Sequence, residues 1–535
     1  IGGMMKKLVL AVITVFCAIT VFSLEVNRSE LESAGTPDSI VFINYTGPHA
    51  VINTIEQIKN IGSTLSPAVT PGNIGIPGSF GNRDLYYVIH AVDPAAKEKL
   101  DADILILGPR SGVDHIINLR RIISSYLSNA YGYSERDADT LSVFITVYNA
   151  VYRSKMDVFN AKYKAVVTQH LEGAKAGLSV NYEEWPGKTQ IVIPLSDLEG
   201  GLGTIDTSVI SDKQVVASMQ ETETKEVDAR KDMVDIKERE AQDAQKAAAD
   251  AQKAAADAQK KAAEEEAKRK AEEERLKKAQ EEAAAAQKKA QENPDDAQAQ
   301  KDAADKQKEA EEQKKSVEEQ QQKVDEAKQE AEELKTTAKE EQVIADKKTS
   351  EAQADRISIA KDMQELLQNA DLLAVMDTTY GLKLIDQTNL LSAIVLFDTK
   401  TGKVVKESPV NVIRNRQVIQ NNNGFIAIAG KTGGNAAVKL VILDSRSMEI
   451  IKESSEIISE KSMLAYDTEF VFAVMESAGK WYLGRYTFDL ALSLKSDITV
   501  DQATPIVISE KGISVTSSDG QVTLLASDTL KAVKE

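Results

Sequence analysis

The chain has 535 residues and a formal net charge of −18 at pH 7. This acidic balance argues against nucleic acid as a partner, because surfaces that bind duplex DNA are basic. The one cysteine, Cys17, lies in an N-terminal apolar run. If export removes that run, the mature chain has no thiol, which excludes cysteine nucleophiles, cysteine-based zinc sites and disulfides.

Residues 1–23 have the pattern of a secretory signal peptide. Lys6 and Lys7 precede an apolar run at residues 8–22, and Ser23 supplies a small residue for cleavage before Leu24. Residues 1–3 precede a methionine, so they resemble either a misassigned translation start or a cloning scar. The run is short for a membrane span, so we expect export to the periplasm or the outer envelope, with no span after cleavage. A lipid anchor on Cys17 and an uncleaved N-terminal anchor are the alternatives.

Residues 24–212 have an ordinary globular composition and predict an N-terminal mixed α/β domain. Apolar runs with β-branched residues predict strands, and apolar residues at helical spacing predict helices. The predicted strands are 38–45, 84–92, 102–107 and 189–194, and the predicted helices are 51–61, 113–129, 137–152 and 155–170.

This domain contains few residues that suggest chemistry. The four histidines are dispersed and match no metal-binding spacing; they are His49, His90, His115 and His170. Glu183 and Glu184 stand beside Trp185, as in some sugar-binding sites, but adjacent carboxylates do not face each other across a substrate. We therefore predict no catalytic, cofactor-binding or metal-binding residue and no cofactor.

Two glycine-containing stretches resemble phosphate loops only superficially. The turn 108–112 precedes a helix, where an anion could bind free backbone N–H groups, but a plain loop is the simpler interpretation. Gly424 and Gly430-Lys431-Thr432 have the wrong spacing for a nucleotide loop, and the residues between them predict a strand.

Residues 213–367 predict a long helical coiled coil that is rich in alanine, lysine and glutamate. Residues 243–249 form the unit Asp-Ala-Gln-Lys-Ala-Ala-Ala, which repeats in the residues that follow. A seven-residue period places one apolar stripe along a helix. The first stripe comprises Val227, Val234, Ala241, Ala248, Ala255 and Ala262, and the second comprises Val317, Val324, Ala331, Ala338, Ala345, Ala352, Ile359 and Leu366. A solvated single helix is the alternative, because alanine buries little apolar surface.

Asn293-Pro294 divides the stretch into two nearly equal arms. Asparagine is a good N-cap and proline suits the first helical position, so a second helix is expected to start there. Equal arms favour an antiparallel hairpin over a kinked rod.

Residues 371–535 contain an internal repeat of a strand, a polar turn opened by aspartate, and a return strand. The turn aspartates, Asp398, Asp444, Asp489 and Asp528, are 46, 45 and 39 residues apart. A period near 40–45 residues with several strands per unit is typical of propeller blades. We therefore predict an all-β, four-bladed propeller-like domain; a twisted meander or a partial propeller is the alternative. The whole chain is thus predicted to be multidomain α+β.

Several stretches of the two end domains resemble a known family; they are 42–48, 54–58, 117–123, 145–153 and 185–191. They are similar to the 83/100-kilodalton antigen family of spirochaetes, known from Borrelia and Treponema. The middle of the chain differs from the family pattern, since the Borrelia members carry longer and less regular charged repeats there. The resemblance implies an exported cell-envelope antigen and carries over no catalytic residue.

The expected function is that of a non-enzymatic envelope protein with two binding heads joined by a helical spacer. Its expected partners are envelope proteins or an envelope polymer, with no nucleic acid, and the coiled coil allows self-association. One alternative is a secreted hydrolase that uses carboxylates of the N-terminal domain, such as Glu183 or Glu184. Another is a periplasm-spanning scaffold, because the helical stretch is similar to that of TolA.

Overall fold

The computed structural model describes residues 39–533, apart from 53, 67–73, 97, 197, 199–200, 374–376 and 422–423. The predicted signal peptide and Cys17 therefore lie outside the described residues. The chain divides into two compact units. The hairpin unit is Arg230–Lys361, and the globular unit combines the described residues up to Ala229 with those from Asp362 onward.

The N-terminal part of the globular unit contains a four-stranded antiparallel sheet in the order β1-β2-β3-β4. The strands are β1 (Gly78–Asn82), β2 (Tyr86–Ala91), β3 (Asp101–Leu107) and β4 (Thr189–Leu195). All seven residues of β4 are buried, so this strand lies in the core. The helices are α3 (Ile55–Thr64), α4 (Ile116–Tyr131), α5 (Glu135–Val151), α6 (Met156–Lys162), α7 (Ala165–Thr168), η1 (Tyr182–Glu184), α8 (Thr207–Ile210) and α9 (Lys213–Gln220).

Two predictions for this part were wrong in detail, and one strand was missed. Residues 39–45 are extended but join no sheet, and only Ile43 forms a bridge, to Asn181. The predicted helix at 155–170 is two short helices, because Leu100 bridges to Tyr163 and the chain must be extended there. Strand β1 was not predicted, since two of its five residues are glycine.

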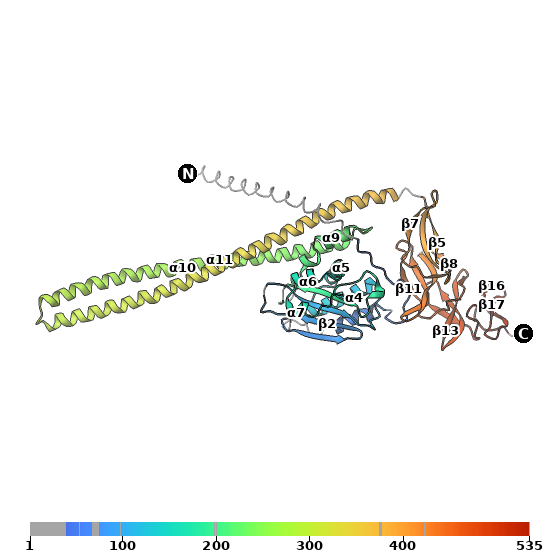
Figure 1. Ribbon diagram of the computed structural model, residues 1–535, viewed down its shortest axis with the longest axis horizontal. Helices are drawn as coiled ribbons and strands as arrows, with labels where there is room; N and C mark the ends of the chain where they lie inside the picture. Colours follow the sequence, from blue (N-terminus) through green and yellow to red (C-terminus); the bar gives the residue numbers. More distant parts are fainter. Residues whose placement is uncertain are drawn as a thin grey trace. The chain divides into compact units, whose positions relative to one another are not determined.

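The hairpin unit is built from α10 (Val227–Glu292) and α11 (Ala297–Leu373), which start and end just outside it. The two helices run side by side in opposite directions (Figure 1). Ala262 and Ala331, one from each predicted stripe, pack together with Ala258 and Ala327. At 1.5 Å per residue, the 66 residues of α10 extend over about 100 Å. The predicted antiparallel hairpin is confirmed.

Two details of the predicted helical stretch need correction. A helix does begin at Lys213, as α9, but the stretch is not continuous, because Lys225 and Glu226 have φ angles of 50° and 45° that interrupt it before α10 begins at Val227. The cap of α11 is Asp296 instead of Asn293. Its Oδ1 accepts hydrogen bonds from the backbone N–H groups of Gln298 and Ala299, at 2.9 and 3.2 Å.

The C-terminal part consists of four antiparallel meanders that follow one another along the chain. The first comprises β5 (Thr378–Asp386), β6 (Leu391–Asp398) and β7 (Val404–Glu407), and the second comprises β8 (Ile413–Asn421), β9 (Gly424–Gly433), β10 (Ala436–Asp444) and β11 (Ile450–Glu453). The third comprises β12 (Ala465–Tyr466), β13 (Phe470–Ser477), β14 (Lys480–Thr487) and β15 (Leu492–Lys495), and the fourth comprises β16 (Val507–Ser509), β17 (Gly512–Thr516) and β18 (Val522–Leu525).

The repeat inferred from the sequence is visible in the hydrogen bonds. The carboxylates of Asp398 and Asp444 each accept a hydrogen bond from a backbone N–H group of the following turn. The donors are Thr401 and Ser447, each at 2.6 Å. A buried serine then ends each return strand and donates its N–H to the middle strand of its meander. These bonds are Ser408 to Ile394, Ser454 to Leu440 and Ser496 to Leu483, at 2.7, 2.8 and 2.9 Å.

Successive meanders stack face to face. Strand β9 directs Ile426 and Ile428 into a core shared with β13, and Phe425 and Ala427 into a core shared with β6. Strand β13 likewise contributes to a further core with β17. The described strands do not show a closed ring, so the four-bladed propeller itself stays a prediction. The first two meanders also share one sheet, because the irregular end of β8 places Ile413 beside Ser392.

The sequence suggested two separate heads, whereas the structure groups both in the globular unit. The antiparallel hairpin returns the chain to its origin, so the parts before and after it can meet. Thr46 Oγ1 donates to the carbonyl of Pro409 at 2.8 Å. The backbone N–H of Ala50 donates to the carbonyl of Asn435 at 2.7 Å.

Candidate functional site

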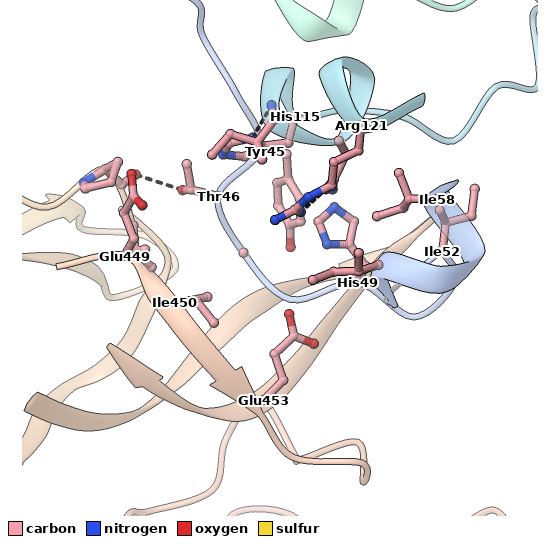
Figure 2. Close-up of a pocket in the computed structure, with 16 residues that line it drawn as sticks. Tyr45, Thr46, His49, Ile52, Ile58, His115, Arg121, Glu449, Ile450 and Glu453 are labelled. Carbon is pink, nitrogen blue, oxygen red and sulfur yellow. Dashed lines mark hydrogen bonds between the residues drawn. The ribbon is translucent and has the colours of Figure 1, made fainter. Parts of the chain in front are cut away.

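A cavity of about 270 Å³ opens where the N-terminal segment passes between α4 and the second meander (Figure 2). It combines ionisable side chains with a wall of isoleucines. The lining residues that carry the argument are Tyr45, His49, His115, Arg121, Glu449 and Glu453, and the apolar wall comprises Ile52, Ile55, Ile58, Ile117 and Ile450.

His49 is paired with Asp114 at the edge of this cavity. Its Nε2 lies 2.6 Å from Asp114 Oδ1, and both side chains are largely buried. The backbone N–H of Tyr45 donates to the carbonyl of Asp114 at 2.8 Å, which holds the N-terminal segment against the start of α4. The pair therefore sits on two segments that are themselves fixed.

His115 is the N-cap of α4 and remains neutral. Its Nδ1 accepts a hydrogen bond from the backbone N–H of Ile117 at 3.1 Å. Burial lowers the pKa of His115 to about 4, because a charged imidazolium is poorly solvated there. With Nδ1 accepting, the proton of the neutral ring is on Nε2.

Tyr45 is a neutral phenol that packs edge-on against His49, with ring centroids 5.2 Å apart. Its hydroxyl donates to the carbonyl of Pro48 at 3.3 Å. Burial raises the pKa of Tyr45 to about 12, and the nearby charge of Asp114 adds to this effect. The hydroxyl is therefore a hydrogen-bonding group at neutral pH and not a phenolate nucleophile.

The charged groups of the cavity are of both signs. Arg121 donates to Asn118 Oδ1 through Nη1 at 2.9 Å, and Glu453 forms an ion pair with Lys439 at 3.1 Å. Among the lining residues, no serine or cysteine hydroxyl or thiol stands beside His49, and Thr46 is bonded to Pro409. The arrangement suits the binding of a ligand that has both a positive and a negative group.

The two carboxylates suggested by the sequence lie elsewhere. Glu183 and Glu184 belong to η1, and neither lines the cavity. Glu184 accepts a hydrogen bond from Ser179 Oγ at 2.7 Å, while the indole of Trp185 donates to the Ser179 carbonyl at 2.8 Å. These contacts give Glu184 a structural role around the fully buried Trp185.

The glycine turn at 108–112 is likewise structural. The backbone N–H groups of Gly108, Arg110 and Ser111 all donate to backbone carbonyls, which removes them from an anion site. Within the described part of the chain, no three His, Cys, Asp or Glu residues cluster as metal ligands would.

The comparison with known families decides which family this is. The model of the Borrelia P83/100 protein matches residues 28–506, which is most of the chain. The chain belongs to this family. The family resemblance noted in the sequence is thereby confirmed, and an antigen family fits an exported or surface protein. A search of curated proteins found no match.

No described helix of this P83/100 family member has the length and apolar character that crossing a bilayer requires. A buried polar cluster lies outside the cavity, at His90. The His90 ring contacts Asp103 Oδ1 through Nδ1 at 2.5 Å and the Ile74 carbonyl through Nε2 at 2.6 Å. The hydroxyls of Tyr126 and Tyr131 both donate to Asp103 Oδ2. Because both ring nitrogens face acceptors, His90 is held as an imidazolium.

Sequence reasoning missed that His49 and His115 of this P83/100 family member share one cavity. The two residues are far apart in the sequence and have no motif spacing. The usable signal was Asp114-His115 directly before a strongly amphipathic helix, which marks a helix N-terminus where polar side chains gather.

Proposed function

We propose that this P83/100 family member is an exported, non-enzymatic envelope protein that binds envelope components through its globular unit. The observation that carries the proposal is the His49 cavity. Its ionisable groups are engaged in structural contacts, as in the His49–Asp114 pair, and are not assembled as a nucleophile with a base.

The ligand that fits this cavity is a short peptide segment with both a carboxylate and an ammonium group. Arg121 offers a cation to the carboxylate, and Glu449 and Glu453 offer anions to the ammonium group. The isoleucine wall suits an apolar side chain or stem. Such segments occur at the ends of envelope proteins and in peptide-containing envelope polymers, which are the two partner classes expected from the sequence.

The hairpin unit is proposed to act as a spacing arm. Its two helices bury mainly alanine against each other, and ion pairs such as Lys261–Glu330 and Lys306–Glu282 join them across the seam. An arm of this kind holds a fixed length without needing a large core.

The proposed propeller-like nature of the C-terminal part rests on the alternation of β9 and β13 between two cores each. Propeller blades are buried on both faces in this way. Such stacked meanders present loops that suit protein binding.

Capture from an envelope extract tests the proposal. The double variant Arg121→Ala with Glu453→Gln is expected to lose a partner that the unaltered mature chain retains. The matched control removes residues 244–264 and 326–346, three heptads from each facing arm, and is expected to retain it. If the shortened arm loses the partner while the cavity variant keeps it, the binding surface is the hairpin and the proposal is wrong.

A hydrolase is the second candidate, because the His49–Asp114 pair resembles a general base with its orienting carboxylate. It would have to activate water, since the lining offers no nucleophile beside the ring. Hydrolysis of envelope peptides or polymer by the mature chain, abolished by His49→Gln, would favour it. The TolA-like scaffold remains a further proposal, which N-terminal sequencing of the mature protein tests: an intact anchor supports it.

A further inference from the structure

Among the residues that the structure describes, the first meander of the C-terminal part has no counterpart of the first strand that the other three have. Strands β8, β12 and β16 each precede and pair with the next strand of their meander, β9, β13 and β17. Among the described residues, β5 occupies the place of these second strands but pairs with β6 alone. The chain before β5 is helical as far as Leu373, so the sequence that supplies a first strand elsewhere forms the end of α11 here.

The burial of β5 reflects this missing neighbour. Seven of the ten residues of β9 and five of the eight of β13 are buried, whereas none of the nine residues of β5 is. Three of its apolar side chains, Tyr380, Leu384 and Ile385, are 36%, 43% and 42% exposed. A long edge strand with exposed apolar side chains is a template for the addition of another strand.

We propose that β5 pairs with β5 of a second copy of this chain, antiparallel and centred on Leu382. In this register Tyr380 faces Leu384 of the second copy and Leu382 faces its counterpart, all on one face of the joined sheet. Lys383 faces Gly381, so no like charges lie directly opposite each other, and the irregularity of β5 after Leu384 ends the regular pairing. The strand is therefore complementary to itself.

Other segments of the chain fit this edge less well. Residues 24–38, which precede the described part, contain five charged residues, one proline and few β-branched residues, a composition that disfavours strands. Self-association through α11 is the rival, since Val343 and Ile357 are 67% and 74% exposed on that helix. The two sources of a dimer are separated by the experiments below.

Cysteine cross-linking tests the register. The mature chain from Leu24 contains no cysteine of its own, since Cys17 is the only one. The double variant Gly381→Cys with Lys383→Cys, on the regular part of β5, places each thiol opposite the other position's thiol in the second copy. Antiparallel neighbours are close enough for a disulfide. Mild oxidation is expected to give a covalent dimer on a non-reducing gel.

The two single cysteine variants are the matched controls. Each thiol then faces Lys383 or Gly381 of the second copy and not another thiol, so little covalent dimer is expected. Equal cross-linking of single and double variants would mean random collision and would overturn the proposal, as would the absence of a dimer in the double variant.

Sedimentation equilibrium of the mature chain provides the second test. Leu384→Lys is expected to weaken the dimer by about tenfold or more, because it places a charge against Tyr380. Val522→Lys, at a residue of β18 that is 79% exposed, is expected to leave the dimer unchanged, and so is Ile357→Lys. A mature chain that stays monomeric, or a dimer lost with Ile357→Lys and kept with Leu384→Lys, contradicts the proposal.

Discussion

At the scale of single residues, the buried ion pair of His90 and Asp103 makes the stability of the N-terminal core depend on the protonation of His90. Both side chains are almost completely inaccessible, at 1% and 0% exposed. Burial by itself lowers the pKa of His90, but the hydrogen bond to Asp103, the charge of Asp103 and the Ile74 carbonyl together raise it above its ordinary value. The folded protein therefore binds this proton more tightly than the unfolded chain does.

The stability of the globular unit is expected to fall as the pH rises. A raised folded-state pKa contributes stability that is complete below the unfolded value of 6.5 and is lost as the pH rises through the folded value. Urea unfolding at a series of pH values above 6 checks this. A Trp481→Phe background leaves Trp185, which is buried in the same part of the unit, as the only reporter.

Asp103→Asn serves as the comparison for this pH series. It removes the charge opposite His90 and should cost about 3–5 kcal/mol at pH 6, because an imidazolium remains buried without its partner. The free energy of unfolding of this variant should also depend much less on pH than that of the unaltered protein. A pH profile that is the same in both proteins would show that His90 does not titrate as described.

The cavity shows what single residues could not reveal in the sequence. The histidines and Arg121 were visible only as dispersed residues, because nothing in their spacing indicates that a turn at residues 46–50 places them together. Glu183 and Glu184, which the sequence offered only for the alternative hydrolase, do not line the cavity, because they belong to a short helical turn where a hydrogen bond to Ser179 engages Glu184.

At the scale of elements, the contact between α3 and α4 depends on Gly62. A Cβ at this position would lie 2.2 Å from the carbonyl oxygen of Ile122 and 2.8 Å from the backbone N of Tyr126. Gly62→Ala is therefore expected to destabilise the globular unit by about 1–3 kcal/mol, even though alanine favours helices. Thermal unfolding measures the loss, and Asn60→Ala, at an exposed position of the same helix, should change little.

The hairpin seam is expected to reject charge at buried alanines. Ala345 is fully buried in the seam, and Val343 on the same helix is 67% exposed. Ala345→Asp should lower the stability of the hairpin by roughly 1–3 kcal/mol, because an unpaired carboxylate is desolvated there. Hydrogen exchange of the peptide containing residues 338–352 should accelerate. In the Val343→Asp variant the exchange of this peptide should stay unchanged. If both variants accelerate the exchange equally, the seam does not lie at Ala345.

The elements of the hairpin were predictable because heptad stripes record which face is buried. Val234, Ala248, Val324 and Ala352 are all buried, as the stripes indicated. The break before Val227 was not predictable, since two residues with positive φ angles cause it and neither is glycine. Similarly, the repeat predicted the meanders, but the missing strand beside β5 depends on where α11 ends.

At the scale of the whole molecule, the globular unit is assembled from sequence on both sides of the hairpin. Short segments join its two parts: residues 46–50 meet Pro409 and residues 435–437, mostly through backbone groups. Backbone hydrogen bonds of turns leave no periodic pattern in a sequence. This is why two heads were predicted where one discontinuous unit is found.

A disulfide between Ala50→Cys and Asn435→Cys tests this joining most directly. The two residues lie next to the antiparallel bridge between His49 and Ala436, where opposite Cα atoms are close enough for the bond. In a chain that starts at Leu24, and so lacks Cys17, the one cysteine of the sequence, mild oxidation should form an intramolecular disulfide in nearly all molecules, and the pair Ala50→Cys with Asp519→Cys should keep free thiols. If the two thiols introduced at positions 50 and 435 stay free, or link only between chains, the two parts are separate heads and the account is wrong.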